Sequence, residues 1–92
     1  MIDYLMHDEQ DTVGVAVVDI KKGHLARGRT LMGNGAPEIE VLSEIPLGHK
    51  IALRDFEPGD TIIKYGVDIG KVVNSIKTGE HVHVHNLKTK RW

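Results

Sequence analysis

Three of the chain's six histidines stand at alternate positions in one short stretch near its C-terminal end. Residues 79–86 read Gly-Glu-His-Val-His-Val-His-Asn, which spaces His81, His83 and His85 two residues apart. In an extended strand successive side chains point to opposite faces, so the imidazoles line one face and the intervening valines the other. Imidazole titrates near neutral pH, acts as general acid or base and ligates borderline metal ions. The row therefore predicts a metal site or an acid–base element.

Strand geometry limits how these histidines can share one ion. Residues two apart on a strand stand about 7 Å apart at Cα, so two neighbouring rings can reach the same ion. Three rings on one straight strand cannot easily do so. A half-exposed edge strand, with valines inward and histidines outward, gives the same pattern, and the sequence alone leaves both interpretations open.

The other histidines stand in or near predicted turns. His49 opens a predicted strand after a turn, where a histidine is more often solvated than catalytic, although loops hold many functional residues. The same expectation of a solvated side chain applies more strongly to His7 and His24.

A cation and a phenol stand together at Lys64 and Tyr65, directly before the permissive Gly66. Such a group suits the binding of a carboxylate or a sulfonate. An exposed strand end before a turn produces the same residues, and the sequence does not separate the two interpretations.

The elements that must position these side chains are short strands joined by a repeated turn. Val and Ile runs are brief and interrupted by Gly or Pro, which is typical of strands and predicts an all-β chain. One unit occurs four times: an apolar residue, two variable residues, glycine, and a polar residue that opens a strand. Its copies are residues 20–24, 45–49, 56–60 and 76–80. We expect each glycine to take the positive φ of a type II turn or a similar loop.

Strands are expected after every copy of this turn unit and in two further places. The four that follow the turns are residues 25–31, 50–53, 61–65 and 81–85. A central strand buried on both faces is predicted over 13–20, and an alternating strand over 38–42 follows a turn-rich tip at 33–37. A tight turn is expected within 64–71, bracketed by Gly66 and Gly70, and a single helical turn at 74–76.

Length and composition bound the possible functions. The 92 residues predict one domain over 1–92, with 86–92 as a docking tail, and a net charge of −1 argues against a nucleic-acid partner. The chain has no cysteine, which excludes disulfides and suits a cytoplasmic protein. It has no apolar run long enough to span a membrane.

The chain resembles the SAF-type domain of the altronate and galactarate dehydratase family. The residues that carry the resemblance are Ile-Pro-Leu-Gly-His-Lys-Ile-Ala-Leu at 45–53, Ile-Lys-Tyr-Gly at 63–66 with Ile-Gly at 69–70, and the histidine stretch at 79–86. The resemblance implies a β-clip, a SAF-like domain of bent hairpins folded over one another.

The resemblance also implies an activity. The chain is similar to separate small (alpha) subunits that act with a large catalytic beta subunit, in a metal-dependent lyase whose metal is iron. The implied reaction eliminates sulfite from 3-sulfolactate, a small anionic substrate, to give pyruvate. Two alternatives stay open: the small subunit of a split altronate- or galactarate-type dehydratase, and a non-catalytic module for anion binding or assembly.

Roles for individual residues follow from the same resemblance. The implied metal ligands are His83 and His85, with His81 as a weaker third member. Asn86 would orient them. The implied catalytic candidates are His83, His85, His49, Lys64 and Tyr65, and His49 enters only through its matching motif. Because a small all-β chain cannot enclose a substrate, either a partner completes the site or the chain is a binding or accessory module.

Overall fold

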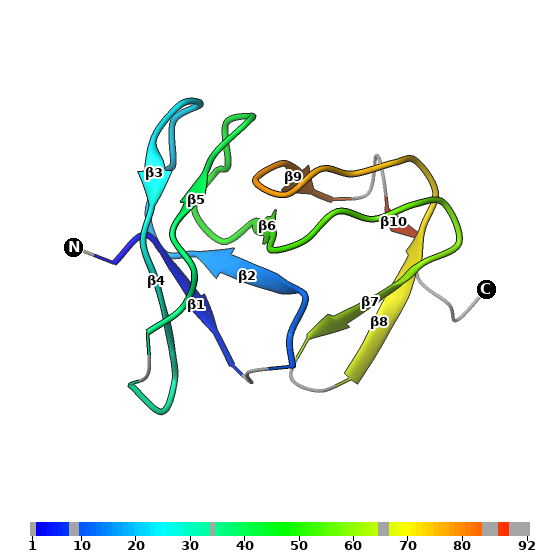
Figure 1. The fold of residues 1–92 in the computed structure, drawn as a ribbon, viewed down its shortest axis with the longest axis horizontal. Coiled ribbons are helices and arrows are strands. Elements are labelled where there is room, and N and C mark those ends of the chain that lie inside the picture. Colours follow the sequence, from blue (N-terminus) through cyan, green and yellow to red (C-terminus); the bar gives the residue numbers. More distant parts are fainter. Residues whose placement is uncertain (1, 8–9, 34, 65–66, 84–86, 89–92) are drawn as a thin grey trace.

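The chain folds into short β-strands, with no helix among the residues that the computed structural model describes, which are 2–7, 10–33, 35–64, 67–83 and 87–88. In that part of the chain, ten strands form three sheets of five, three and two strands (Figure 1). The strands are β1 (Tyr4–Met6), β2 (Val13–Ala16), β3 (Leu25–Ala26), β4 (Gly28–Thr30), β5 (Ile39–Glu40), β6 (Lys50–Ala52), β7 (Thr61–Lys64), β8 (Val67–Val72), β9 (His81–Val82) and β10 (Leu87–Lys88). The predicted all-β class is confirmed. Among these residues no helix is long and apolar enough to cross a membrane.

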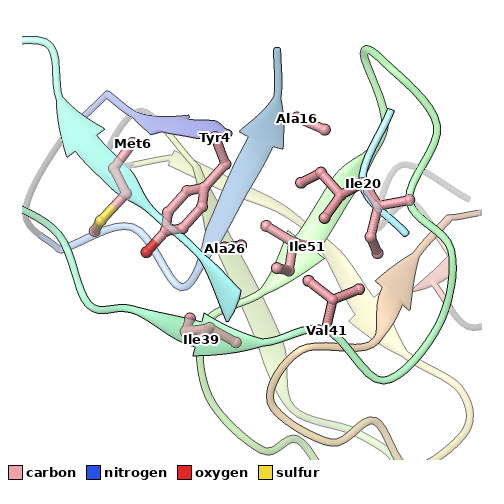
Figure 2. Packing of buried hydrophobic residues seen from close by; sticks show 9 residues of the cluster. Tyr4, Met6, Ala16, Ile20, Ala26, Ile39, Val41 and Ile51 are labelled. Atoms are coloured by element: carbon pink, nitrogen blue, oxygen red, sulfur yellow. The ribbon is translucent and has the colours of Figure 1, made fainter. Parts of the chain in front are cut away.

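The five-stranded sheet, in the order β4-β1-β2-β6-β9, has a hydrophobic core on each face. Side chains alternate across it, so Ile51 of β6 belongs to the first core and the next residue, Ala52, to the second. The first core fills the space between this sheet and the β3–β5 pair (Figure 2). The second lies towards β7 and β8, and its buried members are Val13, Ala52, Phe56, Ile62, Val72, Ile76 and Val82.

All four predicted turn units are present and have the predicted backbone. Their glycines, Gly23, Gly48, Gly59 and Gly79, have φ values of 90°, 86°, 97° and 91°. In each unit, the carbonyl two residues before the glycine accepts a hydrogen bond of 2.9–3.1 Å from the N–H of the residue after it. Positive φ at the third of four residues, with this hydrogen bond, defines a type II turn.

The turn units associate in two pairs. Ile20 pairs with Ile45, and Phe56 pairs with Ile76, each pair through reciprocal backbone hydrogen bonds of 2.7–2.9 Å. All four of these apolar side chains are buried, in the first and second cores respectively. The residues that open the four units therefore also fasten the hairpins to one another.

In each pair, the aspartate directly before the first unit accepts hydrogen bonds from the second unit of the same pair. The Leu47 N–H donates to Asp19 Oδ1 at 2.8 Å. In the other pair the Thr78 N–H donates to Asp55 Oδ1 at 2.7 Å, and the Thr78 hydroxyl donates to the same oxygen at 2.9 Å. These bonds, the backbone one foremost, hold the pKa of the Asp55 carboxyl below its usual value. The two pairs are thus built alike.

The Tyr4 ring fills a slot in the first core that two glycines leave open. A Cβ at Gly14 would lie 2.4 Å from the ring, and a Cβ at Gly28 would lie 2.2 Å from it. The Tyr4 hydroxyl donates to the Pro37 carbonyl oxygen, which ties β1 to the segment before β5. The absence of side chains at the two glycines is what lets β2 and β4 flank this ring.

Several predicted strands are shorter than expected. The strand predicted over 13–20 ends at Ala16, and Val17 is 37% exposed, so the expectation of burial on both faces along its length is wrong. The segment 25–31 divides into β3 and β4 at Arg27, whose N–H donates to Asp3 Oδ2 at 2.9 Å.

Two local predictions near the second pair are also corrected. The helical turn expected at 74–76 is wrong, because Ile76 bonds to Phe56 instead of forming a helix. Gly70 does not bracket a turn. It lies inside β8, and the pairing of Lys64 with Val67 places the β7–β8 connection at 65–66.

Replacing Tyr4 by phenylalanine should flatten the alkaline loss of stability. Burial raises the pKa of Tyr4 to about 12, so between about pH 10 and 12 the folded chain keeps a proton that an unfolded tyrosine loses. The contribution of Tyr4 to the free energy of unfolding therefore has its full value below about pH 10 and declines as the pH rises through this range. Tyr4→Phe should cost about 1 kcal/mol near neutral pH, through the lost hydrogen bond. Urea unfolding at a series of pH values measures both effects, and parallel curves for the two proteins would contradict the expectation.

Candidate functional site

Two neighbouring strands, β6 and β9, and the residues that flank them bring three histidines together at the edge of the five-stranded sheet. The edge strand β9 pairs antiparallel with β6, and Ile51 stands opposite His81. Continuing this register by two residues sets His49 opposite His83. Directly opposed residues project from the same face, so the side chains of all three histidines extend from the face that carries Ile51.

The three imidazoles are in contact. His49 Nδ1 and His81 Nε2 share a hydrogen bond of 2.8 Å. The His49 and His83 rings stack with centroids 4.4 Å apart, and the His81 and His83 rings stack at 5.5 Å. One ligand nitrogen from each residue lies within 4.8 Å of the other two, and all three side chains are half-buried.

The backbone around β9 is held on both sides, although the strand is at a sheet edge. The Gly79 N–H donates to the Ala52 carbonyl at 2.8 Å, and the Gly79 carbonyl accepts from the Leu42 N–H at 2.9 Å. The His81 N–H donates to Ser43 Oγ at 2.9 Å. The segment after β5 therefore fixes the start of β9 from the side that faces away from β6.

The backbone of His49 is equally well fixed. Its N–H donates to the Pro46 carbonyl within the turn unit at 2.9 Å, and its carbonyl accepts from the Ala16 N–H at 2.9 Å. Both bonds belong to the framework of turns rather than to the cluster. The imidazoles thus project from backbone positions that the fold determines independently of any ligand.

The donor set suits a transition metal. Three imidazole nitrogens, with no carboxylate in the group, favour zinc, copper, iron or nickel over magnesium or calcium. An iron site, which the family resemblance implies, is compatible with these ligands.

Of the histidine row, His81 and His83 lie side by side on one face, as the alternation indicates. His85 and Asn86 lie outside the described residues, as does Tyr65, and Lys64 is the last residue of β7. Roles for these residues remain predictions.

His49 joins the cluster, whereas the residues alone favoured a solvated turn position for it. His49 stands directly before the strand that pairs with the histidine stretch. That pairing cannot be recognised from the sequence, so the position of His49 along the chain did not identify it as a member of the cluster. His24 is exposed, as expected, and its Nε2 lies 3.2 Å from Oδ2 of the buried Asp3. His7 is half-buried, and its backbone N–H donates to Asp11 Oδ2 at 3.2 Å.

The fold and this cluster define a small all-β domain that presents contacting imidazoles at one sheet edge. Residues 2–90 match the family model described as the altronate/galactarate dehydratase SAF domain, and the chain belongs to this family.

Two relatives have the same name. The chain is 51% identical over 92 residues to the (2R)-sulfolactate sulfo-lyase subunit alpha of Chromohalobacter salexigens, a match that covers 99% of this chain and 98% of that protein. It is 58% identical over 50 residues to the protein of that name from Paracoccus pantotrophus, covering 54% of this chain and 75% of the relative.

A longer relative is an altronate dehydratase. The Bacillus subtilis enzyme is 43% identical over 89 residues, which cover 97% of this chain but only 17% of the enzyme. The chain therefore corresponds to a small part of that dehydratase.

Gly79→Ala should destabilise the fold more than Gly59→Ala does. Both residues have positive φ, which costs an alanine about 1–2 kcal/mol, but a Cβ at Gly79 would also lie 2.2 Å from the Glu40 carbonyl oxygen, whereas Gly59 has nothing within 4 Å. We expect a further loss of about 1–3 kcal/mol at Gly79 from overpacking. Denaturant unfolding of the two variants measures the difference, and equal losses would contradict a close approach of Gly79 to Glu40.

Proposed function

We propose that the chain is the alpha subunit of a two-subunit lyase that eliminates sulfite from 3-sulfolactate to give pyruvate. The observation that carries this proposal is the 51% identity to a sulfo-lyase alpha subunit along 98% of that protein's length. The name of that relative implies a second subunit, and we propose a large catalytic beta subunit as the partner. Both subunits would act in the cytoplasm.

The proposed reaction makes clear chemical demands. A base takes the proton from C2, which is a weak acid beside a carboxylate, and the C3–S bond breaks as sulfite departs with the bonding electrons. The remaining enol becomes pyruvate when C3 gains a proton. Negative charge develops on the carboxylate and the 2-hydroxyl carbon before sulfite leaves, so the site must stabilise an enediolate-like state. A divalent metal, when bound, supplies that stabilisation as a Lewis acid.

The histidines of this chain supply groups that fit these demands. His81 and His83 project together from the sheet edge, and neutral imidazole can accept a proton or ligate a metal. We assign His83 and His85 as metal ligands or acid–base groups, with His81 as a further ligand and Asn86 orienting them.

We further propose that two residues outside the histidine cluster contact the anionic substrate. Lys64 and Tyr65 would bind its carboxylate or sulfonate. Because the three clustered histidines are half-buried in the isolated chain, a partner surface that covers them would exclude water and complete the site.

A second candidate function is dehydration of an altronate- or galactarate-type sugar acid. The 43% identity to an altronate dehydratase supports it. The same proton abstraction would be followed by loss of hydroxide, as water, in place of sulfite. This reaction therefore requires the same acid–base or metal-ligating groups from the histidines.

A purely anion-binding module has less support. A hollow of about 310 Å³ elsewhere on the chain includes Arg54, but it also includes Asp11, which is 5% exposed. A buried carboxylate in the lining opposes the binding of an anion.

Assaying the chain together with the product of its neighbouring gene tests the reaction. We expect the co-expressed pair to release sulfite from 3-sulfolactate, and His83→Ala with His85→Ala to lower kcat by about 10²–10⁴-fold, the contribution typical of acid–base groups. His24→Ala is the matched control, because His24 is exposed and outside the cluster, and should retain the parent rate.

Altronate and galactarate belong in the same assay. Loss of water from either, without sulfite release from 3-sulfolactate, would establish the dehydratase instead. An inactive pair on all three substrates would contradict both enzymatic proposals, and full activity in the double variant would remove His83 and His85 from the mechanism.

A further inference from the structure

We propose that His49, His81 and His83 form a three-histidine site for a transition-metal ion on this chain by itself. The site needs no ligand from a partner in order to bind the ion. His49 thereby takes the place of His85 in the ligand set that the family resemblance implies. The inference deepens the proposed function, on which it rests for the use of the ion in catalysis but not for its binding.

The distances between the three rings are close to those of a metal complex. Two imidazole nitrogens on one tetrahedral zinc ion, each about 2.0–2.1 Å from it, are about 3.3 Å apart. The His49 and His81 nitrogens are 2.8 Å apart, and all three ligand nitrogens lie within 4.8 Å of one another. Because the His83 ring is stacked on the other two, rotation about its χ1 and χ2 has to turn its nitrogen towards the ion, and the broad energy wells of χ2 permit part of this change.

The cross-strand position of His49 solves the geometric problem that the histidine row poses. In an extended chain the first and third members of the row, His81 and His85, stand about 13 Å apart at Cα. Their rings cannot reach one ion from a straight strand. His49 projects from the residue directly before β6, across from His81 and His83, so two neighbouring segments bring the three rings together.

The contact between His49 and His81 identifies where the ion would enter. In their hydrogen bond one nitrogen carries a proton and the other offers a lone pair. A metal ion requires lone pairs from both nitrogens, so the ion replaces the hydrogen bond and the proton moves to the other nitrogen of the same ring. This change of tautomer leaves each ring neutral. The fixed backbones of both residues keep the cost of reorganisation low.

The ligand set also predicts which ions bind and how. Imidazole-only coordination selects zinc, cobalt, nickel, copper or ferrous iron, and disfavours magnesium and calcium. Three protein ligands leave at least one position open, which is typical of catalytic rather than structural sites. Half-burial of the cluster leaves that position accessible to a substrate oxygen or to a partner group.

Metal titration of the chain without its partner tests this inference. The chain is stripped with a chelator and titrated with Zn²⁺ against a chromophoric competitor, and with Co²⁺ by its visible absorption. We expect one ion per chain, with no displacement by a large excess of Mg²⁺ or Ca²⁺. Loss of a group that only orients a ligand weakens binding by about 10–100-fold, so His49→Ala, His81→Ala and His83→Ala should each weaken it by at least about 100-fold.

One histidine variant serves as a control. His24→Ala should bind Zn²⁺ with the parent affinity, because His24 is exposed and lies outside the cluster. If an alanine variant unfolds by circular dichroism, the corresponding asparagine variant keeps a polar side chain of smaller size and replaces it in the titration.

The outcomes separate this inference from the proposed function. A chain that binds no ion, or a His49→Ala variant with parent affinity, overturns the three-histidine site, whatever the activity of the pair. Loss of binding in His85→Ala with retention in His49→Ala establishes the ligand set of the single strand instead. A chain that binds one ion through the three histidines, beside a pair that releases no sulfite, supports the site and contradicts the lyase.

Discussion

The register between β6 and β9 is the constraint on which the candidate site depends. It is set outside the two strands, by the reciprocal hydrogen bonds of Phe56 with Ile76 and by the position of Gly79 against the Glu40 carbonyl. A shift of one residue would turn His81 to the opposite face and bring Val82 to the face of the cluster. The turn units therefore do more than reverse the chain, since they determine which side chains face one another across the sheet edge.

The sequence was sufficient to predict the local structure of the turns. A glycine with positive φ and a hydrogen bond across four residues are local requirements, so Gly23, Gly48, Gly59 and Gly79 could be recognised one at a time. The alternation of His81 and His83 was equally local. The pairing of the units was not predictable in this way, because it joins residues whose spacing along the chain differs between the two pairs.

The same limit explains why the residues alone favour a solvated turn position for His49. It lies 32 residues from His81, and no periodicity connects them. Its membership in the cluster follows from β6 lying beside β9, which is a consequence of core packing: Ile51 enters the first core, and Ala52 and Val82 enter the second. Only the motif shared with the family pointed to His49, and such a motif indicates that a residue matters without saying what it contacts.

The location of the cluster follows from the size of the chain. Both faces of the central sheet are covered by core side chains, so the residues that remain for chemistry lie at the sheet edge. An edge strand offers accessible side chains but little enclosure. A chain of this size therefore gains from presenting rings on a rigid edge and leaving enclosure to a second protein, which agrees with the subunit names of its relatives.

One local difference between the turn units concerns the residue at the position of His49. In the third and fourth units the last residue is a carboxylate that accepts a hydrogen bond from the first turn residue: the Glu57 N–H donates to Asp60 at 2.8 Å, and the Lys77 N–H donates to Glu80 at 2.6 Å. The second unit has Pro46 at the donor position, and proline has no N–H to satisfy.

No carboxylate is therefore required at the end of the second unit, and the side chain there is released from the turn. An imidazole at position 49 can project towards β9 at no cost to the turn, which remains closed by the hydrogen bond from the His49 N–H to the Pro46 carbonyl. The proline that stiffens this turn thus also frees the position that brings the third histidine to the other two.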